Sequence, residues 1–252
     1  PKQSQLEGLD WVIFDIQDVG TRFYTYISTM HYMMDACARH GIRMIVLDRP
    51  NPNGDYVDGP VLRKGFESFV GMHPIPVVHG MTVGELAGMI NGEGWLTDSA
   101  SCDLFVVPVE NYYHQYQYSL TVKPSPNLPN DLAIRLYPSL CYFEGTMMSV
   151  GRGTEFPFQV VGYPDSSYGR FQFTPESRPG AGDPRYEGER CYGRDFRDIR
   201  RRPRFTINYV IEFYYKSGRS DEFFNDYFDK LAGNAELRQQ IMAGLTEEEI
   251  RI

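Results

Sequence analysis

The sequence has 252 residues, a net charge of −8 and a pI near 5.2. A chain of this length buries a sizeable core, as one large domain or as a main domain with a smaller companion. The acidic balance excludes a general nucleic-acid binder, which needs a dense face of Lys and Arg, and the one basic run (residues 197–204) is short and lies beside acidic residues.

Three short apolar runs predict strands in the first half of the chain. They are WVIFDI (11–16), RMIVLD (43–48) and CDLFVVPV (102–109). The first is expected to be a strand covered on both faces, and the second is expected to be buried in the same way.

Two helix patterns separate these runs. After the first run, apolar residues recur at helical spacing until Gly41 supplies a stop: Ile27, Met30, Met34 and Cys37. Before the third run, Thr82 with Glu85 predicts a capping box, and one face of the helix that follows is apolar: Val83, Leu86, Ala87 and Ile90. This alternation of strands and helices predicts an open α/β layer with a parallel sheet and right-handed crossovers.

The composition changes near residue 119. Two stretches, 124–140 and 143–158, are rich in Pro, Gly, Ser and Asn and are expected to be mostly loops. A strand is expected at FQFTP (171–175), and helices near 207–217, 221–232 and 235–243. We therefore predict an α/β domain over residues 1–118 and a second, smaller α+β domain over residues 119–252, with a ligand cleft between them.

Polar side chains gather where the first two strands end. They are Asp15, Gln17, Asp18 and Arg22 after the first strand, and Asp48, Arg49 and Asn51 after the second. Open α/β sheets bind ligands at the carboxyl ends of their strands, so these side chains are candidate site residues. Alternatively, aspartates such as Asp15 and Asp48 only cap the next helix or accept local backbone N–H groups.

The sequence disfavours a cofactor. A dinucleotide site needs a Gly-rich turn after its first strand, and here the turn DIQDVGTR (15–22) has one glycine and two carboxylates that would repel phosphate. No phosphate-binding P-loop, paired histidine spacing, Gly-x-Ser-x-Gly elbow or Cys-x-x-Cys pair occurs. No apolar run approaches the roughly 20 residues that cross a bilayer. We expect no metal, no nucleotide cofactor and no membrane span.

The remaining polar groups suit a sugar. Carboxylates, amides and the 18 tyrosines can hydrogen-bond to sugar hydroxyls and stack on sugar rings. Glycoside hydrolysis uses two carboxyl groups, and Glu144, among Gly and Ser residues in an expected loop, is harder to explain structurally than the strand-end aspartates. Ser125 is more simply explained as a turn cap.

Seven blocks of the sequence resemble the NamZ-type exo-β-N-acetylmuramidases, a bacterial family long described as a domain of unknown function. In chain order they are FDIQDVGTRFYTYISTM, VLDRPNPNG, DGPVL, PIPVVHGMTVGELA, PSPNLP, YPSLCYFEGT and VGRGTEFPFQVVGYP. The resemblance implies a Rossmann-like sheet joined to an auxiliary domain, with the active cleft between them. It also implies release of N-acetylmuramic acid from the non-reducing ends of peptidoglycan fragments, in the periplasm or outside the cell.

The resemblance also implies residue roles. Glu144 and Asp18 are the expected catalytic carboxylates, and one arginine is expected to bind the lactyl group of the sugar. The expected substrate-binding residues are Asp15, Gln17, Arg22, Tyr24, Tyr26, Arg49, Asn51, His79, Ser125, Asn127 and Arg152. Family members look longer at the N-terminus, where a Pro-Glu-His-Gly stretch carries the glutamate usually suspected of catalysis, so we expect a fragment. The alternative is a muropeptide-binding module without turnover.

Overall fold

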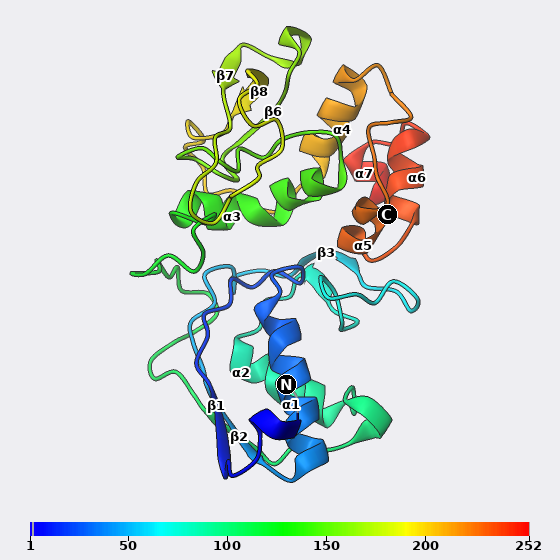
Figure 1. The fold of residues 1–252 in the computed structure, drawn as a ribbon. Coiled ribbons are helices and arrows are strands. Elements are labelled where there is room, and N and C mark those ends of the chain that lie inside the picture. The colour runs from blue at the N-terminus through cyan, green and yellow to red at the C-terminus, as the bar shows by residue number, and fades with distance from the viewer. Residues whose placement is uncertain (2, 252) are drawn as a thin grey trace. The chain divides into compact units, whose positions relative to one another are not determined.

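The computed structural model describes residues 1 and 3–251, and the chain divides into two compact units (Figure 1). The first unit comprises the chain up to residue 58 together with residues 67–118. The second comprises residues 59–66 and the chain from residue 119 onwards. Each unit has its own sheet and its own helices.

A parallel sheet forms the centre of the first unit. Its strands are β1 (Trp11–Phe14), β2 (Arg43–Leu47) and β5 (Leu104–Val107), in the order β1-β2-β5. Both neighbouring pairs are parallel, with Phe14 beside Val46 and Val46 beside Val106. The predicted α/β class with a parallel sheet is confirmed.

Two helices connect these strands, α1 (Tyr26–His40) and α2 (Val83–Gly92). Gly41 ends α1 with a φ of 66°, a left-handed conformation that glycine adopts without a steric penalty from a Cβ. The predicted capping box starts α2, because the Thr82 hydroxyl accepts the Glu85 N–H and the Glu85 carboxylate accepts the Thr82 N–H. The apolar faces of both helices share one buried core with the inner face of the sheet.

Within residues 1 and 3–251 the sheet is covered on one face only, so the expectation that its first two strands are buried on both faces is wrong. On β1, Val12 and Phe14 are 9% and 4% exposed, whereas Trp11 and Ile13 are 45% and 60% exposed. On β5, Phe105 is 60% exposed. An unbroken apolar run has no alternation of polar and apolar residues, so the sequence does not indicate which face of the strand is exposed.

Shorter elements complete the first unit. They are the 3₁₀ helix η1 (Gln3–Gln5), β4 (Pro76–Val78) and the 3₁₀ helix η2 (Thr97–Ser99), and β3 (Asp58–Val61) leads into the second unit. The segment after β1 holds β4 in place, because the Arg22 N–H donates to the Val77 carbonyl at 2.8 Å. This contact brings His79, directly after β4, beside the polar segment that follows β1.

The second unit combines an antiparallel sheet with helices. The sheet order is β6-β8-β7, from β6 (Val160–Tyr163), β7 (Phe171–Phe173) and β8 (Cys191–Asp195). The helices are α3 (Asp131–Leu140), η3 (Cys141–Gly145), η4 (Ser166–Tyr168), α4 (Asn208–Lys216), α5 (Tyr227–Ala232), α6 (Glu236–Met242) and α7 (Glu247–Ile250). The strand predicted at FQFTP is confirmed as β7.

Two helical segments differ from the prediction. The helix α3 occupies a stretch expected to be mostly loop, because the Asn130 side chain caps it by accepting the Ala133 N–H at 2.9 Å and Pro138 falls only near its end. The helix α5 begins at Tyr227 rather than near residue 221. Asn225 accepts the Tyr227 N–H at 2.9 Å, which fixes the start of that helix.

Candidate functional site

Side-chain amides join the loops at the carboxyl end of the parallel sheet. Gln17, after β1, donates to the Pro50 carbonyl after β2 at 2.9 Å. Asn51 donates to the Met81 carbonyl after β4 at 2.8 Å. Gly20 passes so close to Asn51 that a Cβ at this position would lie 2.1 Å from the Asn51 Oδ1. The segments after three strands are therefore locked together by hydrogen bonds and close packing.

The two strand-end aspartates both have protein partners. Asp15 accepts from the Nε of Arg49 at 2.9 Å, and the side chains of Arg49 and Asp15 are 40% and 48% exposed. Asp48 accepts from the Gly84 N–H and from the Thr82 hydroxyl, each at 2.7 Å, at the start of α2. Asp48 thus fits the structural alternative, since it joins β2 to the next helix, whereas an exposed pair such as Asp15–Arg49 adds little stability.

Arg22, Tyr24 and Tyr26 line neither of the two pockets described below. Arg22 is 0% exposed, and its Nη1 donates to the Ile75 carbonyl at 2.8 Å. Tyr24 is buried with its ring edge-to-face against Tyr26, and burial raises the pKa of Tyr24, which keeps its phenol protonated. Their roles in substrate binding stay predictions.

Asp18 and His79 form a buried pair. Each residue is 3% exposed, and the Asp18 Oδ2 lies 3.5 Å from the His79 Nε2. The same Oδ2 accepts the Gly20 N–H at 2.6 Å, and Oδ1 has no hydrogen-bond partner among the described residues. The His79 Nδ1 accepts the Met81 N–H at 3.3 Å, so Nε2 is the ring nitrogen that faces Asp18.

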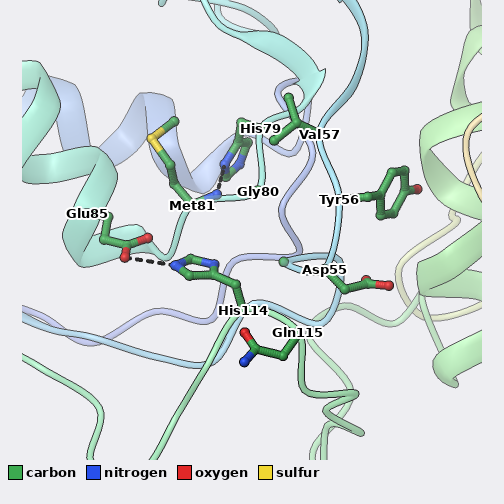
Figure 2. A pocket seen from close by; sticks show the side chains of 10 residues that line it. Asp55, Tyr56, Val57, His79, Gly80, Met81, Glu85, His114 and Gln115 are labelled. Carbon is green, nitrogen blue, oxygen red and sulfur yellow. Dashed lines mark hydrogen bonds and ion pairs between the residues drawn. The ribbon is translucent and has the colours of Figure 1, made fainter.

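An open pocket of about 580 Å³ lies beside His79 (Figure 2). Its lining comes from segments after β2, β4 and β5 and from the first turn of α2, so it lies at the carboxyl edge of the parallel strands. The lining residues are Gly54, Asp55, Tyr56, Val57, His79, Gly80, Met81, Glu85, His114 and Gln115.

Carboxylates and histidines supply most of the polar groups of this pocket. Figure 2 shows His114 against Glu85, with 2.9 Å between the His114 Nε2 and the Glu85 Oε1. Asp55 and Gln115 add further hydrogen-bonding groups to the lining. Sequence analysis missed Asp55, Glu85 and His114, although the rule that ligands bind at strand ends could have found them by position.

A second cavity, of about 340 Å³, lies within the second unit. It is lined by Glu144, Met148, Ser149, Val150, Arg152, Arg185 and Tyr227. The Arg152 Nε donates to the Glu144 Oε1 at 2.6 Å, and the Arg152 guanidinium lies 4.9 Å from the centre of the Phe158 ring. The structure thus brings two predicted site residues together and adds Arg185 and Tyr227, which carry no motif that sequence reasoning could have used.

Ser125 and Asn127 form part of a turn in the second unit and line neither cavity. The Ser125 Oγ accepts the Asn127 N–H at 3.2 Å, as expected of a turn cap. The Asn127 side chain donates to the Gly180 carbonyl at 2.8 Å. Both side chains have structural partners, and their roles in substrate binding stay predictions.

The two cavities offer hydrogen-bonding and charged groups to a ligand. Within residues 1 and 3–251, no group of three or more His, Cys, Asp or Glu side chains could hold a metal ion. Over the same residues, no helix has both the length and the apolar character to traverse a bilayer. Carboxylates, guanidinium groups, imidazoles and phenols in open concave sites suit a small polar ligand.

A parallel sheet with a polar pocket at its carboxyl edge is typical of α/β proteins that bind small polar ligands. The family described as exo-β-N-acetylmuramidase NamZ matches the chain along nearly its whole length, with the N-terminal part at residues 1–132 and the C-terminal part at residues 135–252. The chain belongs to this family.

Individual proteins that are similar to this chain support this family assignment. The peptidoglycan β-N-acetylmuramidase NamZ of Bacillus subtilis (strain 168) is 38% identical over 99% of this chain, and the chain spans 64% of the length of that relative. A crystal structure of a DUF1343 family protein from Bacteroides fragilis NCTC 9343 is 47% identical, with a TM-score of 0.95 over 99% of this chain and 72% of that one. A second DUF1343 protein of that strain is 29% identical, with a TM-score of 0.82 over 100% of this chain and 72% of its own.

Proposed function

We propose that this protein is a glycoside hydrolase that releases N-acetylmuramic acid from the non-reducing ends of peptidoglycan fragments. The observation that carries the proposal is membership of the exo-β-N-acetylmuramidase family across both units, with a relative named as a peptidoglycan β-N-acetylmuramidase. Because such a substrate is cell-wall material, the proposal includes action in the periplasm or outside the cell.

Glu144 is the stronger candidate of the two predicted catalytic carboxylates. It lines the cavity of the second unit, where a sugar could contact it, whereas Asp18 is 3% exposed and lines neither cavity. Asp18 lies against His79, which does line the pocket of the first unit, so Asp18 acts there as a positioning residue. We assign chemistry to Glu144 and orientation of His79 to Asp18.

A charge-neutral substitution tests the role of Glu144. In Glu144→Gln, the amide oxygen can still accept from the Arg152 Nε, so the cavity wall is retained while the acid–base or nucleophilic carboxylate is lost. We expect hydrolysis of an aryl N-acetylmuramoside, measured as release of the chromophore, to fall at least about 100-fold in kcat. If this variant kept the wild-type kcat, Glu144 would not be a catalytic residue.

Glu155→Gln serves as the matched control. Its side chain is 80% exposed, lies 3.9 Å from Arg178 and lines neither cavity. We expect this variant to hydrolyse the aryl muramoside at the wild-type rate. An equal loss in both variants would mean that the assay reports general damage rather than catalysis.

One observation favours the alternative of a muropeptide-binding module without turnover. Both predicted catalytic carboxylates are already engaged by the protein, Asp18 by the Gly20 N–H and Glu144 by Arg152. Under this alternative, N-acetylmuramic acid raises the thermal unfolding midpoint of the purified chain, yet the aryl muramoside is not cleaved. Chromophore release that Glu144→Gln abolishes would reject the binding module in favour of the hydrolase.

A further inference from the structure

The cavity of the second unit has walls that tertiary contacts hold in place. Gly145 packs so closely on α5 that a Cβ would lie 2.4 Å from the Phe228 Cα, and its carbonyl accepts the Asn225 N–H at 3.0 Å. The Tyr186 hydroxyl donates to the Met147 carbonyl at 2.6 Å. Segments distant in the sequence are thus fixed around one cavity, as a preorganised binding site requires.

Of the charged side chains that line the cavity, one cation has no carboxylate partner in the part of the chain that the structure describes. Arg152 and Glu144 compensate each other as an ion pair. Arg185 makes no ion pair with any described residue, and its Nη1 donates to the carbonyls of Thr146 and Met148. A guanidinium carries five N–H donors, so this anchoring fixes the group and leaves others for a ligand. The lining therefore has an excess of one positive charge.

Neutral donors lie beside this cation. Burial raises the pKa of Tyr227 to about 12, so its phenol stays protonated and can donate a hydrogen bond. The Ser149 Oγ accepts the Gly151 N–H at 3.3 Å, which leaves the hydroxyl hydrogen for another acceptor. A guanidinium with hydroxyl donors is the arrangement that binds a carboxylate.

We propose that this cavity binds the carboxylate of an acidic sugar, with Arg185 as its cationic partner and Tyr227 as a second donor. The inference rests on the proposed function, in which the lactyl group of N-acetylmuramic acid supplies that carboxylate while the same sugar faces Glu144. The three arginines among the expected substrate-binding residues, one of which was expected to bind this group, have other partners. Arg22 binds the Ile75 carbonyl, Arg49 pairs with Asp15, and Arg152 pairs with Glu144.

The test compares two sugars that differ only in the lactyl group. N-acetylmuramic acid and N-acetylglucosamine are titrated into the purified chain by isothermal calorimetry, for the wild type and for Arg185→Gln. We expect the wild type to bind the acidic sugar about tenfold more tightly, and Arg185→Gln to lose this preference without a change in its affinity for N-acetylglucosamine. Tyr227→Phe should lose a smaller part of the preference.

Two variants separate binding from folding. Arg185 also holds two carbonyls, so Arg185→Lys, which keeps the charge, should retain part of the preference even if Arg185→Gln is unstable. Arg178→Gln removes an arginine that is 39% exposed and lines neither cavity, and it should bind both sugars as the wild type does.

The outcomes distinguish this site from the enzyme activity. The proposed carboxylate site would be overturned if Arg185→Gln kept the full preference for N-acetylmuramic acid, or if the wild type bound both sugars equally or bound neither. In each of these cases, hydrolysis of the aryl muramoside would still decide the enzyme activity. If the preference for N-acetylmuramic acid depended on Arg185 but the protein cleaved no aryl muramoside, the proposed activity would be wrong and the carboxylate site would stand.

Discussion

Gly20 shows how a single residue shapes the loops at the end of the parallel sheet. Its φ is 72°, and a Cβ would lie 2.1 Å from the Asn51 Oδ1. In Gly20→Ala, Asn51 must move and weaken its hydrogen bond to the Met81 carbonyl. We expect a loss of about 3 kcal/mol of unfolding free energy, from backbone strain plus overpacking, measured by urea unfolding followed by tryptophan fluorescence. Both tryptophans, Trp11 and Trp95, lie in the first unit.

Gly41→Ala separates the two causes. Gly41 has a similar φ of 66°, and a Cβ there would meet no atom within 4 Å. This variant should lose only about 1 kcal/mol, the backbone component. Equal losses in the two variants would show that the contact between Gly20 and Asn51 contributes nothing beyond its backbone angle.

At the scale of an element, β1 presents two apolar faces with different surroundings. Phe14 is 4% exposed, and its neighbour Ile13 is 60% exposed. We expect Phe14→Ala to lower the unfolding free energy by about 3–5 kcal/mol, while Ile13→Ala costs less than about 1 kcal/mol. Comparable losses in urea unfolding would mean that both faces of the strand are covered in solution.

Element by element, the sequence predicted what depends on neighbouring residues. The capping box of Thr82 and Glu85 and the stop at Gly41 are local signals, and both appear in the structure. The open face of β1 was not predictable, because Trp11 and Ile13 are as apolar as the buried Val12 and Phe14 that alternate with them. The helix α3 was missed because its proline and flanking asparagine are typical of loops as well as of capped helices.

At the scale of the whole molecule, site residues marked by their neighbours in the sequence were predicted, and those brought together by tertiary packing were not. Asp18 and Asn51 were predicted as site residues because strand ends are recognisable in the sequence, and His79 because of the family resemblance; the structure places all three at the carboxyl edge of the sheet. Arg185 and Tyr227 meet Glu144 only through tertiary packing of the second unit. No periodicity or spacing marks such residues, so a long-range cavity becomes visible only when the fold is known.

Acid stability depends on a buried histidine pair in the first unit. His73 is 0% exposed, and its Nε2 lies 3.1 Å from the His31 Nδ1. Burial, with smaller effects of His31 and His79, lowers the pKa of His73 to about 3, and burial lowers that of His31 as well. In the unfolded chain a histidine titrates near pH 6.5. Between these values the unfolded chain binds a proton that folded His73 does not, so this stability is present above about pH 6.5 and is lost as the pH falls.

We expect His73 to account for a loss of about 1.5 kcal/mol between pH 6.5 and pH 5, a window above the titration of most carboxylates. His73→Gln, which can still hydrogen-bond to His31, should remove this part of the slope in urea unfolding followed by tryptophan fluorescence. Ile75→Val, a nearby core substitution that adds no titratable group, should lower stability by about 1 kcal/mol equally at both pH values. If His73→Gln kept the wild-type slope, the folded histidine would have to bind its proton at nearly the pH of the unfolded chain, and its burial would carry no acid sensitivity.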